Sequence, residues 1–310
     1  MEILGQLLNA LPGSVSQGLI WGIMAIGVYI TYRILDVADL TVDGSFATGG
    51  AVAVMLILNG GNLWLAMLLA FVAGLIAGAV TGLLHTLMGI PPILAGILTQ
   101  LSLYSINLKI MGKAIQSVNF NQTDLLISLR WVKELAFHNP LITVCIVIIV
   151  LIAVLYWFFG TETGCALRAT GANINMSRAQ GINTSFNKVL GIMLSNGLVA
   201  FSGAFLAQYQ GFADVKMGQG AIVIGLAAVI IGEAIFGKIF KNFALRLLSV
   251  ALGSVIYYIV VQAVITMGLD ANLLKLLSAV IVAIFLAIPY WKNQHKAKHM
   301  VKSKGGKANA

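Results

Sequence analysis

Charged residues are scarce in this chain. Asp, Glu, Lys and Arg make up 9% of the 310 residues, whereas a soluble domain carries about 25%. So few charges cannot cover the water-facing surface of a soluble protein of this length. Hydrophobic residues make up 59% of the chain, and apolar runs of about the 20 residues that cross a bilayer recur along it. The composition predicts one all-α, polytopic integral membrane helix bundle.

Features of several other protein classes are missing. The chain has two cysteines, Cys145 and Cys165, which provide no disulfide framework and no metal spacing. Residues 1–11 lack the basic start and cleavage site of a secretory signal. No His-Glu-x-x-His motif, serine–histidine pair or metal cluster is apparent, so an intramembrane enzyme is disfavoured. We expect a non-catalytic chain without a cofactor of its own.

The predicted bundle has about eight to ten spans within residues 1–290. The expected helices cover 15–32, 46–58, 63–86, 92–110, 139–160, 188–209, 219–236, 245–266 and 272–290. The second is too short to cross alone, which predicts a broken or re-entrant helix with a weak point at Gly49-Gly50. Residues 291–310 form a separate basic tail.

Lysine and arginine predict the orientation. Six of the 19 basic residues lie in the last 20 positions, which is typical of a cytoplasmic end held against anionic lipid rather than of nucleic-acid binding. With a cytosolic C-terminus, alternation of the spans makes 33–44, 161–188 and 237–244 cytosolic and places 111–138 outside. The N-terminus is then outside with nine crossings, and inside if the second span is re-entrant.

The long polar stretch 161–188 reads TETGCALRATGANINMSRAQGINTSFNK. Asn173 or Asn175 can cap a short helix that runs through Gln180, and Gly181 can end it. Such a helix, carrying Arg178, suits docking into a cleft on a soluble partner. A solvated loop between two spans explains the composition equally well, so the residues alone leave both readings open.

The same stretch resembles the cytoplasmic coupling segment of the ABC permeases that import branched-chain amino acids and ribose. The positions that match the pattern G-x-x-L-R-A-x-G-x-N and its A…G-I ending are Gly164, Leu167, Arg168, Ala169, Gly171, Asn173, Ala179, Gly181 and Ile182. The later LSNGLVAFSGAF and the earlier IPPILA are also similar to segments of that family. The turn DLTVDGS resembles its D-L-S-V-G-S turn, in the form of a subgroup associated with tryptophan and tyrosine uptake.

The resemblance implies a binding-protein-dependent importer in the bacterial cytoplasmic membrane. Two identical permeases would enclose the pathway, and an extracytoplasmic solute-binding protein would deliver the solute. Cytosolic ATP-binding subunits, which carry ATP and Mg, would grip the segment 161–188. The coupling residues are then expected to be Arg168, Asn173, Arg178, Ala179 and Gly181. Aromatic amino acids are the first expected solutes, followed by branched-chain amino acids and sugars.

One stretch matches part of an ATP-binding motif. Residues 232–238, GEAIFGK, fit the start of a phosphate-binding loop. The next residue is Ile239, which cannot bind magnesium as Ser or Thr does, and an apolar span precedes the stretch. We therefore interpret the match as chance and expect the ATP site on another chain.

Polar residues at membrane depth are further candidates. Asp36, Asp39 and Asp43 lie near Arg33, where they can pair with the arginine, cap the next helix or help a gate at Gly44. Within the spans, polar side chains form interhelical hydrogen bonds or face a pathway. The candidates for the pathway are Gln100, Asn107 and Asn196.

Glu233 can pair with Lys238 or with a coupling partner. An ion-coupled secondary transporter or channel is the main alternative function, and it would use Glu233 or the aspartate cluster. The missing inverted repeat and the few charges within the spans argue against this alternative.

Overall fold

A computed structural model describes residues 2–118, 125–129, 132, 139–267, 273, 276, 279–280, 282–284 and 287. Helices account for most of this part of the chain, and two short strands form an antiparallel pair. The elements are α1 (Glu2–Tyr29), the π-helix η1 (Ile30–Ile34), α2 (Thr41–Leu58), α3 (Leu63–Thr86), α4 (Pro92–Met111), β1 (Ile115–Ser117), α5 (Pro140–Gly160), α6 (Glu162–Ala172), α7 (Ile174–Ala179), α8 (Thr184–Gln210), β2 (Phe212–Asp214), α9 (Ala221–Phe236) and α10 (Phe243–Thr266).

Seven of the helical segments in the described residues are long and apolar enough to cross a membrane. They are Asn9–Ile34, Thr41–Leu58, Leu63–Thr86, Pro92–Met111, Pro140–Gly160, Thr184–Gln210 and Phe243–Thr266. Helix α9 is apolar but shorter. The prediction of a polytopic all-α membrane bundle is confirmed. Most of the ninth expected span, 272–290, and the whole basic tail, 291–310, lie outside the described residues.

Helix α2 corrects one detail of the sequence prediction. It starts at Thr41, earlier than expected, and runs through Gly49 and Gly50 without a break. These glycines serve packing instead, because a side chain at Gly49 would collide with the backbone of Ala200 and one at Gly50 with the Met217 sulfur. The irregular backbone lies before the helix, at residues 35–40.

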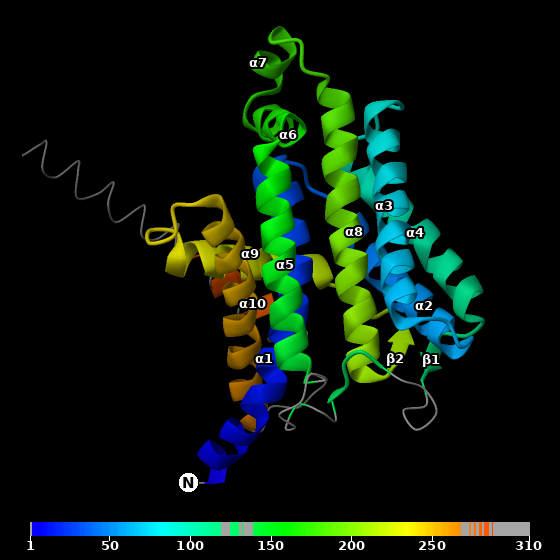
Figure 1. Cartoon of the computed structure of the whole chain (residues 1–310), viewed down its shortest axis with the longest axis vertical. Helices are drawn as coiled ribbons and strands as arrows, with labels where there is room; N and C mark the ends of the chain where they lie inside the picture. The colour runs from blue at the N-terminus through cyan, green and yellow to red at the C-terminus, as the bar shows by residue number, and fades with distance from the viewer. Residues whose placement is uncertain are drawn as a thin grey trace, which may run out of the picture.

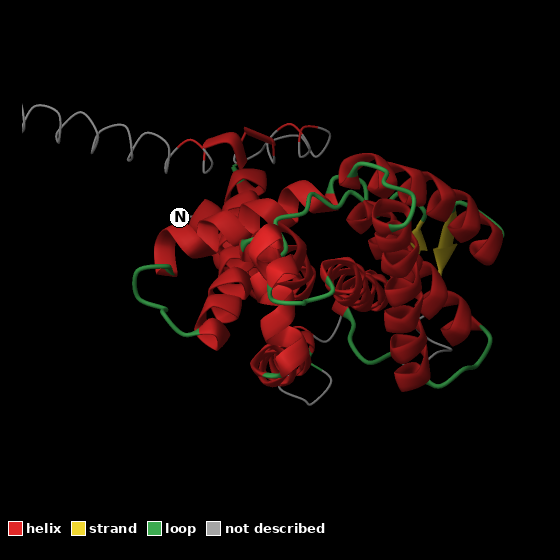
Figure 2. Ribbon diagram, turned by 90° about the horizontal axis from the view of Figure 1, so that it is seen from above, coloured by secondary structure: helices red, strands yellow, loops and turns green. Residues whose placement is uncertain are grey.

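The two ends of the bundle are distinct (Figure 1). The short helices α6 and α7 stand at one end, and the β1–β2 pair lies toward the other, which is also the end where α1 starts, on the opposite side of the bundle. Seen from above, helices make up nearly the whole body and the two strands form a small patch at one side (Figure 2). The start of α1 and the stretch 161–188 are therefore at opposite ends of the bundle, as an odd number of crossings between them requires.

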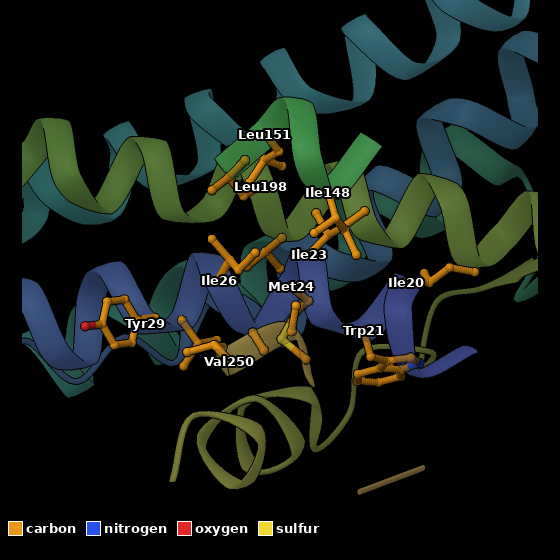
Figure 3. Packing of buried hydrophobic residues seen from close by; sticks show 14 of the residues in the cluster. Ile20, Trp21, Ile23, Met24, Ile26, Tyr29, Ile148, Leu151, Leu198 and Val250 are labelled. Carbon is orange, nitrogen blue, oxygen red and sulfur yellow. The ribbon is translucent and has the colours of Figure 1, made fainter. Parts of the chain in front are cut away.

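Helix α1 runs through the centre of the packed core. Its side chains Ile20, Ile23, Met24 and Ile26 are fully buried, and they lie among residues of α5, α8 and α10 such as Leu198 (Figure 3). Hydroxyl groups from two neighbouring helices donate to α1 carbonyl oxygens: Ser195 to Gly27 at 2.7 Å, Ser202 to Ile20 at 2.7 Å and Ser254 to Gly18 at 2.6 Å. Such bonds join helices where lipid supplies no hydrophobic drive for their association.

Small residues bring α3 and α8 together. Gly74, Gly78 and Gly82 recur every four residues and so share one face of α3. A Cβ atom on any of them would collide with α8 at Asn196, Ile192 or Val189. The glycine stripe therefore lets the two backbones meet directly, as is typical of helix pairs in membranes.

Helices α3, α4 and α5 also present large apolar side chains outward. Exposed examples are Trp64, Leu68, Ile76, Ile97, Leu101, Ile149, Val154 and Trp157. In a soluble protein such faces would be covered, but here they are the surfaces expected against lipid.

Candidate functional site

The end of the bundle formed by α6 and α7 is built from local capping signals. Thr161 Oγ1 accepts from the Gly164 N–H at 3.3 Å and starts α6. Asn173 Oδ1 accepts from the Met176 N–H at 3.0 Å and starts α7. Gly181 then turns the chain with a φ of 78°, a conformation that glycine adopts without strain. The predicted short helix, its Asn173 cap and its glycine end are confirmed.

The tip of this end, residues 173–186, presents both polar and apolar groups. Arg178 is exposed, and its Nε donates to Thr184 Oγ1 at 3.1 Å. Ala179 and Gly181 are exposed beside it. Met176 and Phe186 are 64% and 57% exposed, and neither was a predicted site residue. We call the exposed Met176, Arg178, Ala179 and Phe186 the tip surface.

Helix α6 is fixed firmly to the bundle beneath the tip surface. The Asn187 amide of α8 donates to Thr170 Oγ1 at 3.1 Å. Gly171 lies so close to the backbone of Ile34 that no larger residue fits. Arg168 extends back toward α10, with its guanidinium 5.5 Å from the centre of the Phe243 ring. Arg168 therefore lies apart from the other predicted coupling residues, on the side of α10.

A buried polar network joins the connection before α2 to α8. Asp39 Oδ2 accepts from the Asn196 Nδ2 at 2.6 Å, and Asp39 Oδ1 accepts from the Thr41 N–H at 2.9 Å. Ser45 donates in turn to Asn196 Oδ1 at 2.7 Å. Because Asn196 lies near the middle of α8, Asp39 reaches well into the bundle. The carboxylate thus holds the irregular segment 35–40 against α8.

Three threonines extend this network toward α4. The Thr41 and Thr81 hydroxyl oxygens are 2.7 Å apart, and Thr81 donates to Thr99 at 2.8 Å. All three side chains are buried. One run of hydrogen bonds therefore connects α2, α3, α4 and α8 at the start of α2.

Asp43 performs a different task from Asp39. Its two carboxylate oxygens accept from the backbone N–H groups of Gly220 and Ile222 at 2.9 and 3.0 Å. Asp43 thus caps the N-terminus of α9, whose unpaired N–H groups and dipole favour a negative charge. A cap on the helix that follows in sequence was expected, and the structure corrects this to a distant helix.

Gly44, the third predicted gate residue, lies where α2 meets α4. A Cβ atom there would be 3.0 Å from Leu103 Cδ1 and 3.1 Å from Gln100 Cα. The position therefore requires a very small residue for α2 and α4 to pack, and Gly44 has a packing role in this structure.

Arg33 pairs with none of the three aspartates. Its Nε lies 3.0 Å from Glu233 Oε1 in α9, so Glu233 pairs with Arg33 and not with Lys238, one of the two partners considered for it. Asp36 is exposed and adopts a left-handed conformation with a φ of 56°. The Arg33–Glu233 pair links the end of η1 to the end of α9.

The three predicted pathway residues lie in different surroundings. Asn196 is fully buried within the network of Asp39 and Ser45. Asn107 is also buried, and both polar atoms of its amide lack a hydrogen-bond partner. Gln100 is half-buried, beside Gly44. The structure therefore brings Gln100 near the turn at Gly44 but closes Asn107 and Asn196 off from solvent.

A cavity of about 640 Å³ lies between α1, α9 and α10. Its described lining holds no charged side chain, but it includes the aromatic residues Trp21, Tyr257 and Tyr258 and the amides Gln17, Gln210, Gln219 and Gln262. The Trp21 ring packs on Tyr258 with ring centres 5.8 Å apart, and its buried Nε1 has no acceptor.

None of the residues that line this cavity was among the predicted pathway residues. The amides and rings come from residues up to 245 positions apart, between Gln17 and Gln262. They meet through the packing of α1, α9 and α10, so no local sequence pattern points to them.

Neither a metal site nor a phosphate loop is found in the described residues. No group of three or more His, Cys, Asp and Glu side chains lies together there. Gly232 is inside α9, packed on Ser249, and Gly237 follows the end of that helix. A helical backbone at this point cannot wrap a phosphate as the loop of a nucleotide-binding site does.

Comparison with known proteins agrees with this architecture. A family model described as branched-chain amino acid transport system / permease component matches residues 11–289. The tyrosine transport system permease protein of Clostridioides difficile (strain R20291) is 38% identical over 273 residues, or 88% of each chain. No solved structure matches.

The names of less similar relatives mention other solutes. The fructose import permease protein of Bifidobacterium longum (strain NCC 2705) is 28% identical over 88% of this chain and 75% of its own length. The autoinducer 2 import system permease protein of Yersinia pseudotuberculosis (serotype O:1b, strain IP 31758) is 28% identical over 68% of this chain and 58% of its own. The family model covers most of the chain, and the structure is a multi-pass helix bundle that includes the predicted segment 161–188. The chain therefore belongs to the permease components of the branched-chain amino acid type of ABC transport system.

Proposed function

We propose that the chain is the membrane-spanning subunit of a binding-protein-dependent importer that moves amino acids inward. ATP hydrolysis takes place on separate cytosolic subunits. Two copies of the chain enclose the pathway, and an extracytoplasmic binding protein delivers the solute to the end that carries the β strands. The permease alternates between two packings, and partner binding shifts their populations.

The tip surface is the observation that carries this proposal. Met176 and Phe186 are large apolar side chains exposed beyond the bundle, next to Arg178. Exposed apolar groups with a polar rim are typical of a protein-binding site. Because α6 is bonded to α8 through Asn187 and Thr170, a force on the tip is transmitted to the spans. This arrangement supports a docking site for the ATPase on the cytosolic side. We propose that the C-terminus lies on that side too.

Aromatic amino acids are the proposed solutes. The relative with the greatest identity quoted above is named for tyrosine transport. The cavity lined by Trp21, Tyr257 and Tyr258 offers ring surfaces, and its glutamine amides offer donors and acceptors. Such a lining suits a planar ring attached to a polar head group.

The ion-coupled alternative finds less support. It needs a carboxylate that is free to change its protonation or to bind an ion. Glu233 is paired with Arg33, Asp43 caps α9, and Asp39 is held by Asn196 and Thr41. These three carboxylates therefore have structural partners, and the remaining candidate, Asp36, is exposed.

Assembly with the ATPase tests the proposed coupling site. The permease is co-purified with the ATP-binding subunit encoded beside it, and complex formation and ATP hydrolysis are measured. Arg178→Glu and Met176→Asp are expected to weaken both by about tenfold, because they put negative charge into the tip surface. Lys216→Glu, a charge reversal at an exposed site at the opposite end, serves as the control for assembly. Solute uptake without any ATPase would refute the importer proposal.

Uptake into proteoliposomes tests the solute. Tyrosine and tryptophan should be transported in preference to leucine or fructose. Trp21→Phe, which keeps the ring but removes the N–H, should lower tyrosine uptake several-fold. Trp64→Phe changes an outward-facing tryptophan and should leave uptake unchanged. Equal uptake by both variants would exclude the cavity from the pathway.

A further inference from the structure

A basic groove lies at the end of the bundle that carries α6. It consists of two adjoining hollows of about 640 and 490 Å³. Both are lined by Arg168 and Phe243. The first is bounded by the end of α5 and by Lys241, and the second by η1 and by Arg246. The groove therefore follows the boundary between the spans and α6.

Most of the positive charge in this groove is not neutralised. Arg33 is paired with Glu233. Within the part of the chain that the structure describes, Arg168, Lys241 and Arg246 form no ion pair. All three are exposed, so they are accessible to a ligand. Arg168 shares the first hollow with Lys241 and the second with Arg246, so like charges line each hollow, and a bound anion would relieve their repulsion.

The membrane side of the groove is apolar and aromatic. Tyr156, Trp157 and Phe159, from the last turns of α5, line the first hollow. Trp157 is 71% exposed, and tryptophan and tyrosine are enriched where a membrane protein meets the headgroup layer. Below them, Ile149, Val150 and Val154 of α5 continue the outward apolar face. The cations thus lie directly above a surface suited to an acyl chain.

We propose that the groove binds an anionic phospholipid. Its phosphate lies between Arg168, Lys241 and Arg246, and an acyl chain runs along Trp157 and the outer face of α5. Arginine pairs well with phosphate oxygens because its planar guanidinium donates two parallel hydrogen bonds. A lipid fits better than an acidic protein segment, because the groove continues into the outward face of α5 and lies away from the tip surface. The bound lipid joins α6 to α10 and so steadies the base of the tip.

Lipid binding to the full chain tests the proposal without any ATPase or solute. The chain is placed in nanodiscs of phosphatidylcholine with or without phosphatidylglycerol. The protein is then released from the nanodiscs, and the lipid that stays bound to it is measured by native mass spectrometry. Phosphatidylglycerol should be retained in preference. The triple variant Arg168→Gln, Lys241→Gln and Arg246→Gln should retain about tenfold less of it. A control with the same loss of charge is Lys109→Gln, Lys113→Gln and Lys216→Gln, which are exposed cations toward the other end.

Further control experiments distinguish loss of lipid binding from misfolding of the variant and from binding of another ligand. Lys241→Gln alone changes an exposed residue outside the helices and should still lower retention about threefold in a normally folded protein. Excess inorganic phosphate should not displace the lipid, since it lacks the acyl chain. Equal retention by the triple variant and the wild type would overturn the proposal, as would equal loss in the control. Loss of ATPase binding in the triple variant, with lipid retention intact, would assign the groove to an acidic protein segment instead.

Discussion

The Asn196 amide of α8 donates a 2.6 Å hydrogen bond to the Asp39 carboxylate, 157 positions earlier in the chain. The oxygen of the Asn196 amide accepts a second hydrogen bond, from the Ser45 hydroxyl. This contact fixes the irregular segment before α2 inside the bundle, where backbone without helical hydrogen bonds is tolerated only among protein groups.

Replacement of Asp39 should distinguish its acceptor role from its charge. Asp39→Leu leaves the Thr41 N–H without an acceptor and removes one of the two acceptors of the Asn196 Nδ2, which keeps the Ile192 carbonyl, and it should lower the free energy of unfolding by on the order of 1–3 kcal/mol. Asp39→Asn keeps an acceptor for Thr41 and should cost less. Thermal unfolding in detergent measures both variants. Equal losses would show that the negative charge, rather than the hydrogen bonding, matters.

The cap on α9 predicts a local effect. Asp43→Ala removes both acceptors from the start of that helix and should destabilise it by about 1 kcal/mol. Hydrogen exchange at the Gly220 and Ile222 amides should become faster. Asp214→Ala is the control, because Asp214 accepts from Lys216 in an exposed turn. Unchanged exchange in Asp43→Ala would contradict the cap.

Removing the unpartnered amide of Asn107 should stabilise the bundle. Asn107→Leu has a similar volume and deletes two buried polar atoms without partners, so the unfolding midpoint should rise, by the equivalent of about 1 kcal/mol. Asn196→Leu should lower it, because that amide is fully bonded. A lower midpoint for Asn107→Leu would indicate a hidden partner. Reduced transport by a stabilised Asn107→Leu protein would support the predicted pathway role.

The backbones of α2 and α8 approach so closely at two glycines that alanine should not be tolerated at either position. Gly49→Ala would collide with Ala200, and Gly203→Ala with the carbonyl of Phe46. Each should cost about 1–3 kcal/mol, because the helices must separate. Gly160→Ala has open space around it and is the control. If all three variants unfold together, α2 and α8 are not packed as described.

A native cysteine can report the proposed orientation. Cys165 is exposed on α6, whereas Cys145 lies within α5. A membrane-impermeant maleimide should label Cys165 in inside-out vesicles and not in right-side-out vesicles. Cys165→Ser should abolish the signal, and Met176→Cys in that background should restore it. Labelling from the outside would reverse the proposed topology.

Much of the fold was accessible from the sequence. Eight of the nine predicted segments correspond to helices in the described residues, because hydropathy over about 20 residues reports burial in lipid directly. The Asn173 cap and the Gly181 end were predictable because capping acts over three or four residues. The resemblance to the permease family rested on the same stretch and is confirmed.

The candidate site was less accessible. Met176 and Phe186 were missed, since nothing in the local sequence shows whether an apolar residue near a helix end is covered. Two partners were considered for Glu233, nearby Lys238 and a coupling partner, and neither is Arg33, which lies 200 positions away in the sequence and forms the ion pair.

The membrane character, the positions of the spans and the capped helices of 161–188 follow from the amino-acid sequence, since each depends on interactions within a helix or with the surrounding lipid. Three contacts became visible with the packed helices alone: Asp39 meets Asn196, Asp43 caps a helix 177 positions later, and Arg33 meets Glu233. These contacts depend on which helices lie side by side, and glycine stripes and buried hydroxyls settle that by letting particular backbones approach.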